Sequence, residues 1–177
     1  MNVLGIDTSL TSTGMAWIGP DGVPQPHTSA TKSDGKAGTS RKLARLRHQV
    51  GAVMEVAARA DLVLIEGLSF GSRGSATRDL AGLWWLIVDE LSALDVPVAV
   101  VVPAVLKKWA TGKGNADKFA VGQAIGRRWP AVDLANSDEA DALVLASMGL
   151  HHAGTLPWTP TAVQAQALTA IDWLAAA

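Results

Sequence analysis

The sequence predicts a single α/β domain, on three observations. Its 177 residues are 49% hydrophobic and 18% charged, which suits one sizeable core. Short apolar strands separated by turns open the chain and give way to alternating helices and strands. One later strand, "VPVAVVV", is apolar without alternation, which is typical of a strand buried on both faces of a sheet.

The first 66 residues predict three strands, a helix and a fourth strand. "NVLGI" is the first strand and runs into Asp7, "MAWIG" is the second, and a third follows the turn "GPDGVPQP". A helix is expected from Ser40 to about Arg59, because apolar residues recur there at helical spacing. The apolar run "DLVLIE" then predicts a strand that ends at Glu66.

The rest of the chain is mainly helical around the strand "VPVAVVV". The expected helices cover approximately residues 76–94, 103–110, 116–128 and 137–151, and "GTLPWTP" predicts a linker before a last amphipathic helix. That helix is expected to carry Val163, Ala167, Ile171 and Leu174 on one face. We therefore predict a domain over residues 1–154, followed by a linker and a C-terminal helix over residues 155–177.

Composition argues against several classes of protein. The start "MNVLGIDTSL" lacks the features of a signal peptide and no apolar run is long enough to span a membrane, so we expect a cytoplasmic protein. The absence of cysteine leaves oxygen or histidine as metal ligands, which favours hard cations. A net charge of −1 gives no sign of nucleic-acid binding, although it can hide a basic face beside an acidic pocket.

Four acidic residues occupy positions that predict a shared site. Asp7 and Glu66 each end an apolar strand, and the carboxyl ends of neighbouring parallel strands meet at one edge of a sheet. Asp138 and Asp141 begin the stripe of a helix that continues into the core. A helix cap at Asn136, with a capping box and a favourable helix dipole, explains acids in the first turn but explains Asp141 poorly.

Four converging carboxylates repel one another unless a cation neutralises them or some are protonated. Mg²⁺ is the usual cation where the substrate is a phosphate. The pattern therefore predicts two-metal phosphoryl transfer.

The quoted segments "GIDTSLTSTG", "LVLIEG" and "SDEADAL" resemble, in order and spacing, the RuvC family of Holliday-junction resolvases within the RNase H-like superfamily. "PAVLKKWATGKGNADKFAVGQA" is similar to the basic stretch that this family carries before its acidic helix. The resemblance covers roughly residues 1–152. It implies a five-stranded mixed sheet flanked by helices, with antiparallel strands followed by two parallel strands, and it implies a homodimer.

The resemblance also implies roles for individual residues. Asp7, Glu66, Asp138 and Asp141 would be catalytic and would hold two Mg²⁺ ions, with Mn²⁺ as a substitute, and Lys118 would contact the phosphate. If Asn115 caps its helix, Lys118 also stands in the first turn, where a positive charge opposes the dipole, although a lysine balanced by Asp117 is an equal reading of the sequence alone. Residues expected to bind DNA are Lys107, Lys113, Phe70, Arg73 and Arg78.

The resemblance implies a Mg²⁺-dependent endonuclease that makes paired nicks in four-way DNA junctions and leaves 5′-phosphate and 3′-hydroxyl ends, in DNA recombination and repair. Two alternatives remain open. One is a broader nuclease of branched or flap DNA. The other is an inactive or nucleotide-binding relative, since "GIDTSLTSTG" also resembles the first phosphate loop of actin-like ATPases.

The helix containing "LAGLWWLIV" is apolar on more than one side. One stripe anchors it on the sheet and consists of Leu80, Leu83, Trp84, Ile87 and Leu91. The stripe leaves Trp85, Leu86 and Val88 unexplained. These residues are either covered by another part of the chain or form a dimer interface, and the resemblance favours the dimer.

Overall fold

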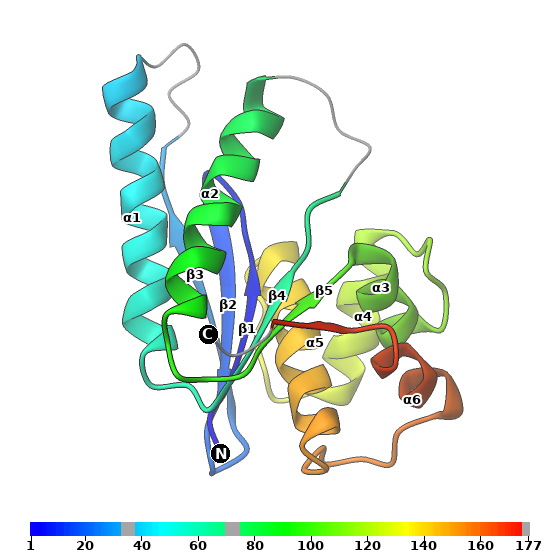
Figure 1. Cartoon of the computed structure of the whole chain (residues 1–177). Helices are drawn as coiled ribbons and strands as arrows, with labels where there is room; N and C mark the ends of the chain where they lie inside the picture. Colours follow the sequence, from blue (N-terminus) through cyan, green and yellow to red (C-terminus); the bar gives the residue numbers. More distant parts are fainter. Residues whose placement is uncertain (33–37, 70–74, 175–177) are drawn as a thin grey trace.

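The computed structural model of the chain describes residues 1–32, 38–69 and 75–174, and its centre is one mixed sheet with helices on both faces (Figure 1). The strands are β1 (Val3–Asp7), β2 (Ser12–Ile18), β3 (Pro24–Ala30), β4 (Leu62–Glu66), β5 (Val98–Val101) and β6 (Asp172–Trp173). They lie in the order β3-β2-β1-β4-β5-β6; β1, β2 and β3 are antiparallel, and β1, β4 and β5 are parallel. The predicted α/β class and strand directions are confirmed.

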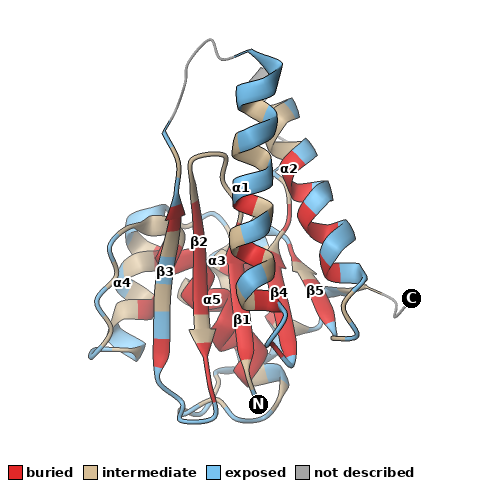
Figure 2. Ribbon diagram, turned by 90° about the vertical axis from the view of Figure 1, so that its left-hand side faces the viewer, coloured by how far each residue is buried: buried red, intermediate tan, exposed pale blue. Residues whose placement is uncertain are grey.

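Alternation along the strands divides the core between the two faces. Leu4, Ile6 and Val63 belong to the cluster under α1 (Thr39–Ala57) and α2 (Ser75–Ser92). Val3 and Leu64 point the other way. The helices of that second face are α3 (Pro103–Thr111), α4 (Lys118–Arg128), α5 (Ser137–His152) and α6 (Ala162–Leu168). In Figure 2, buried residues follow the central strands while the outer surface of α1 is exposed.

The predicted stripe of α2 is confirmed at four of its five positions, and the fifth, Leu80, is half-buried. Leu83, Trp84, Ile87 and Leu91 are buried, and Val88 is buried beside them. Trp85 is 63% exposed and Leu86 44% exposed, so these two are the large apolar residues that the described part of α2 leaves uncovered.

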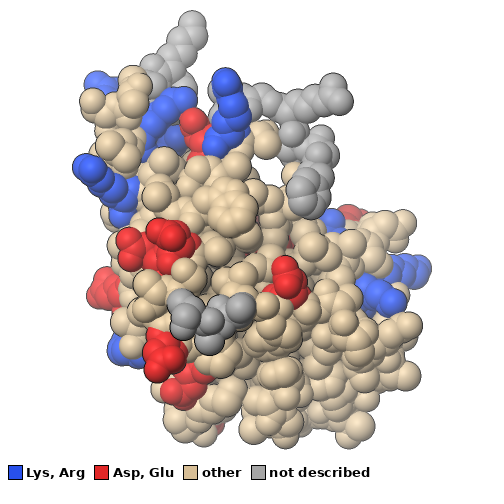
Figure 3. All heavy atoms as spheres, viewed as in Figure 1, with Lys and Arg blue, Asp and Glu red and all other residues tan. Residues whose placement is uncertain are grey.

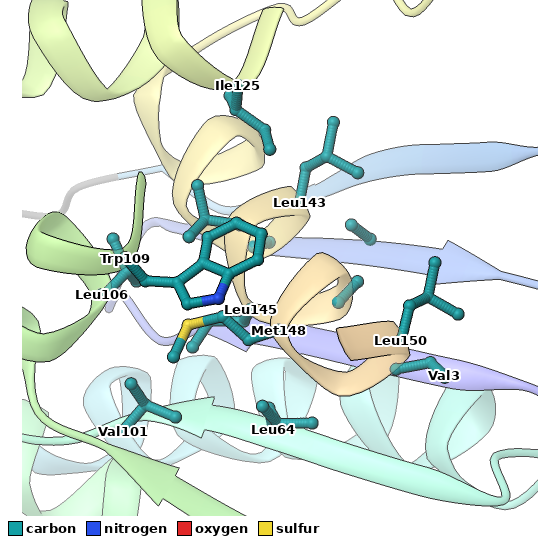
Figure 4. Close-up of a cluster of buried hydrophobic side chains, with 14 of the residues drawn as sticks. Val3, Leu64, Val101, Leu106, Trp109, Ile125, Leu143, Leu145, Met148 and Leu150 are labelled. Carbon is teal, nitrogen blue, oxygen red and sulfur yellow. The ribbon is translucent and has the colours of Figure 1, made fainter. Parts of the chain in front are cut away.

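Helix α5 is the most deeply buried helix of the described chain, with every residue from Glu139 to Leu150 buried. Glycines allow it to lie unusually close to the strands. A Cβ atom at Gly5 of β1 would overlap the backbone of Ala142 and Ala146, and one at Gly14 of β2 would overlap the carbonyl of Asp138. Around this contact, Trp109 and Leu106 of α3 pack with Met148 and Leu64 (Figure 4).

The predicted C-terminal helix is wrong in its second half. Helix α6 ends at Leu168, and Asp172–Trp173 form a strand, β6, antiparallel to β5, so the sheet has six strands and not the five expected. The reason is the free edge of β5, whose unpaired backbone groups gain partners: Leu174 N donates to Val98 O at 2.9 Å. The predicted linker is also packed, since the ring of Trp158 lies 5.4 Å from that of Trp129.

Within the described residues, no helix is both long and apolar enough to cross a membrane.

Replacing Gly5 with alanine should reduce the free energy of unfolding by about 3 kcal/mol, because the new methyl group meets the backbone of α5 and not a movable side chain. Urea denaturation measures the effect. Gly51 offers a matched control, since it lies exposed in α1 with no atom near its Cβ position. Gly51→Ala should stabilise the protein by roughly 0.5–1 kcal/mol, and an equal response of both variants would contradict the role given to Gly5.

Candidate active site

Asp7 and Glu66 lie next to each other at the carboxyl ends of parallel strands. Ile6 of β1 pairs with Ile65 of β4, so the two acids follow one step later on both strands. They share the strand parity of Gly5 and Leu64, which face α5. Both carboxylates therefore point toward the N-terminal part of α5, and Asp7 is only 7% exposed.

Asp138 and Asp141 come from the first turns of α5. Asn136 caps the helix, as predicted, and its Oδ1 accepts from the backbone N–H groups of Asp138 at 3.0 Å and Glu139 at 2.9 Å. Asp141 is 7% exposed, consistent with the inward stripe. The predicted capping box is wrong, because the Glu139 carboxylate accepts from Ala135 N and from the Thr28 hydroxyl instead of the Asn136 backbone.

The four carboxylates act on one another electrostatically. Burial raises the pKa of Asp7 well above its usual range, and the adjacent Glu66 raises it further. Burial also raises the pKa of Glu66, against the opposing effects of a hydrogen bond with Asp7 and the charge of Lys118. Burial, and next the charge of Glu66, raise the pKa of Asp141 to about 6. The site therefore favours uptake of protons or of a cation.

Lys118 lies at the edge of this cluster. Its Nζ is 3.5 Å from Asp138 Oδ1 and 3.3 Å from Ser137 Oγ. Burial lowers its pKa, but the charges of Asp138 and Asp7 outweigh this and raise the pKa overall. The cap of α4 is Asp117, which accepts from Ala120 N, so neither Asn115 as the cap nor the predicted start at Ala116 is correct. Lys118 is the first residue of α4, and its side chain is 64% exposed beside the acids.

The other predicted site residues lie at different distances from the acids. Lys107 of α3 is close enough for its charge to lower the pKa of Glu66 and Asp141. Lys113 lines a groove of about 540 Å³ that also includes Arg127. Arg78 is exposed in the first turn of α2. Phe70 and Arg73 lie outside the described residues.

Two residues near the acids were not identified from the sequence. Gly14 allows α5 to approach β2, and a glycine inside a strand is a recognised sign of such an approach. Thr28 of β3 bonds the side chains of Glu139 and Asn136. Nothing local in "PQPHTSA" distinguishes this threonine from any other on a strand.

The donor set suits a hard divalent cation. All four acids offer oxygen ligands, and burial raises the pKa of three of them, with neighbouring carboxylates adding to the effect. In the part of the chain that the structure describes, no three acidic or histidine side chains already stand at the spacing of a preformed metal centre. The carboxylates are close enough to repel, and a cation would remove that repulsion.

Comparisons with known proteins agree with the geometry. The chain is 30% identical over 154 residues to the crossover junction endodeoxyribonuclease RuvC of Zymomonas mobilis, covering 86% of this chain and 92% of that protein. The structure of Thermus thermophilus RuvC matches with a TM-score of 0.64 at 21% identity, over 91% of this chain and all of that chain. The same protein in complex with a Holliday junction substrate matches with a TM-score of 0.62 at 23% identity, over 91% of this chain and 99% of that one. No protein-family model matches the chain.

The raised pKa of Asp141 predicts how stability varies with pH. A carboxyl whose pKa is about 6 in the fold and about 3.8 unfolded stabilises the fold while protonated, and this contribution is lost as pH rises through about 6. The asparagine of Asp141→Asn stays neutral at every pH. Without metal, the substitution should therefore raise the free energy of unfolding by roughly 1–3 kcal/mol at pH 8 and change it little at pH 4.

Thermal and urea unfolding across pH 4 to 8 measure this difference. Asp95→Asn, at an exposed position between α2 and β5, is the control and should show no comparable gain. Added Mg²⁺ should stabilise the wild type more than the Asp141 variant. If Asp141→Asn is less stable than the wild type at pH 8 without metal, then burial and carboxylate repulsion do not destabilise the charged form of Asp141, and this explanation is wrong.

Proposed function

Because the chain belongs to the RuvC family of crossover junction endodeoxyribonucleases, we propose that it is a metal-dependent endonuclease that makes paired nicks in four-way DNA junctions. The observation that carries this proposal is the set of acids from β1, β4 and α5 gathered at the sheet edge, of which Asp7, Glu66 and Asp141 have raised pKa values. The products would carry 5′-phosphate and 3′-hydroxyl ends. We propose that the enzyme acts on DNA in the cytoplasm.

Asp7, Glu66, Asp138 and Asp141 are the proposed ligands of two Mg²⁺ ions, for which Mn²⁺ would substitute. When bound, such ions activate water and stabilise the departing oxygen of the phosphodiester. The protein's own contribution is to hold the carboxylates away from bulk water, where electrostatic interactions are stronger. It also holds Lys118 in its charged form beside Asp138, where its exposed ammonium group can contact a phosphate.

Basic side chains around the site are the proposed DNA surface. In Figure 3, Lys and Arg gather over the upper ends of α1 and α2 and again at the right, beside α3 and α4. The basic residues of these helices and of the turn between α3 and α4 include Arg41, Arg45, Arg47, Arg78, Lys107, Lys108 and Lys113. Phosphate contacts from such residues position DNA without reading its sequence. A net charge of −1 is compatible with this, because proposed metal ligands account for 4 of the 16 acids.

We propose a homodimer that uses α2. The exposed Trp85 stacks edge-on against Trp84, with ring centroids 4.9 Å apart, and Leu86 lies beside it in the helix. Two symmetric cuts in one junction require two active sites at a fixed spacing, which a two-fold dimer provides. The nuclease unit would comprise residues 1–154, with the later residues packed on it as an addition.

The direct test uses labelled linear, flap and four-way DNA, each with and without Mg²⁺. The wild type should cut the four-way junction in the presence of Mg²⁺. Asp7→Asn should abolish cleavage while retaining folding and junction binding, because it removes a metal ligand but few DNA contacts. Cleavage at the wild-type rate by this variant would disprove the proposed ligand set, and equal cutting of linear DNA would disprove the junction specificity.

Trp85→Glu should convert a dimer into a folded monomer, because it places a charge in the proposed interface. Analytical ultracentrifugation measures the mass, and a junction that reports two nicks within one binding event measures coupling of the cuts. The monomer should nick poorly and lose paired cutting. A wild type that is monomeric both alone and on junction DNA would contradict the dimer.

A further inference from the structure

Three residues form a row across the antiparallel part of the sheet beneath the start of α5. Asp7 of β1 pairs with Gly14 of β2, and Gly14 pairs with Thr28 of β3. Paired residues on antiparallel strands project from the same face. Thr28 is therefore on the same face as the Asp7 carboxylate, two strands away, with the glycine between them.

The Thr28 hydroxyl makes two short hydrogen bonds to the N-terminal end of α5. It donates to Glu139 Oε1 at 2.7 Å and accepts from Asn136 Nδ2 at 2.8 Å. Asn136 is the helix cap, and Glu139 lies on the first turn immediately after Asp138. A strand of the sheet thus contacts both ends of the turn that carries Asp138.

Glu139 and Asn136 extend these bonds to the backbone of the turn. The second carboxylate oxygen of Glu139 accepts from Ala135 N at 2.8 Å, and Asn136 Oδ1 accepts from Asp138 N and Glu139 N. Glu139 is buried, and a buried carboxylate is costly unless its oxygens accept hydrogen bonds. The network therefore holds residues 135–139 in one arrangement.

Gly14 gives this network its position on the sheet. A Cβ there would overlap the Asp138 carbonyl and lie 2.9 Å from Glu139 N, so the turn rests directly on the backbone of β2. Contact with a glycine prevents the turn from moving inward but does not prevent it from sliding along the strand. The Thr28 hydroxyl supplies that lateral restraint, because its bonds fix the turn relative to β3.

We propose that Thr28 is a positioning residue of the active site: its hydroxyl, through Glu139 and Asn136, sets the first turn of α5 and so holds Asp138 and Asp141 in register with Asp7. This inference rests on the proposed nuclease function. Hydrogen bonds behind metal ligands orient them, and losing one typically weakens metal affinity or activity by about 10- to 100-fold.

Thr28→Val tests the proposal, since valine keeps the shape of threonine but cannot bond to Glu139 or Asn136. Mn²⁺ binding to the free protein, measured by calorimetry, should weaken about tenfold, and the Mg²⁺ concentration that gives half-maximal single-turnover cleavage should rise by a similar factor. Junction affinity without metal should stay within about twofold, because Thr28 is not a proposed DNA contact. Thr28→Ser, which keeps the hydroxyl, should restore metal binding.

The matched control is Thr161→Val. Thr161 caps α6 and bonds Gln164, in a segment that carries none of the four acids. Like Thr28→Val, the Thr161→Val variant loses a threonine hydroxyl that bonds at the start of a helix, but it should leave the Mn²⁺ affinity unchanged. If the control weakens Mn²⁺ binding as much as Thr28→Val, or if Thr28→Ser is as defective as Thr28→Val, the hydroxyl has only a general effect on stability and the proposal is wrong.

Glu139→Gln is a second test of the proposal, at a residue of α5 and not of the sheet. An amide has one acceptor oxygen where the carboxylate has two, so when that oxygen accepts from Ala135 N the charge-assisted bond donated by Thr28 is lost, and only a weaker neutral bond from the amide NH₂ can replace it. A shift of Mn²⁺ affinity in the same direction supports the network, and unchanged affinity in both this variant and Thr28→Val overturns it.

The calorimetric measurement separates this inference from the proposed function. A wild type that binds Mn²⁺ and cuts junctions while Thr28→Val does the same disproves the positioning role alone. A wild type that neither binds Mn²⁺ nor cuts disproves the proposed function and this inference with it.

Discussion

The close contact between α5 and the sheet is the constraint on which the active site depends. Gly5, Gly14 and Gly149 face the helix or the strands at points where a Cβ atom would meet other atoms. These contacts bring the first turns of α5 to within side-chain reach of the strand ends at Asp7 and Glu66. A larger residue at such a point would move the helix as a rigid unit, and two of the four carboxylates would move with it.

The same closeness creates an electrostatic conflict. The apolar packing that buries α5 also removes water from Asp7, Glu66 and Asp141, and the protein supplies few positive charges in return, chiefly those of Lys118 and Lys107. Such a site stabilises the fold less than an apolar contact would. Functional residues commonly reduce stability in this way. A divalent cation resolves the conflict, so metal binding and folding stability are expected to be coupled.

The C-terminal segment completes the sheet on the side away from the antiparallel strands. Strand β6 pairs with β5, and Lys108 Nζ of α3 donates to Gln166 Oε1 of α6 at 3.1 Å. The ring of Trp158 lies near Trp109 and Trp129, with the Arg128 guanidinium 5.4 Å from its centroid. The segment therefore packs against the helices that carry Lys107 and Lys118 and helps to fix their position relative to the acids.

The sequence predicts strands β1 to β5, the helices up to α5 and the positions of the four acids, because alternation, helical spacing and strand-end position are local patterns. It did not determine the end of α6, the cap of α4 or the partners of Glu139. The end of α6 and the partners of Glu139 depend on what lies nearby in space: the free edge of β5, and a threonine 111 residues earlier in the chain. The cap of α4 is local, since Asp117 accepts from Ala120 N, but the sequence pattern does not distinguish Asp117 from Asn115 as the cap. Hydrogen bonds between residues far apart in the chain are determined by tertiary packing, because the fold must first bring the donor and the acceptor together.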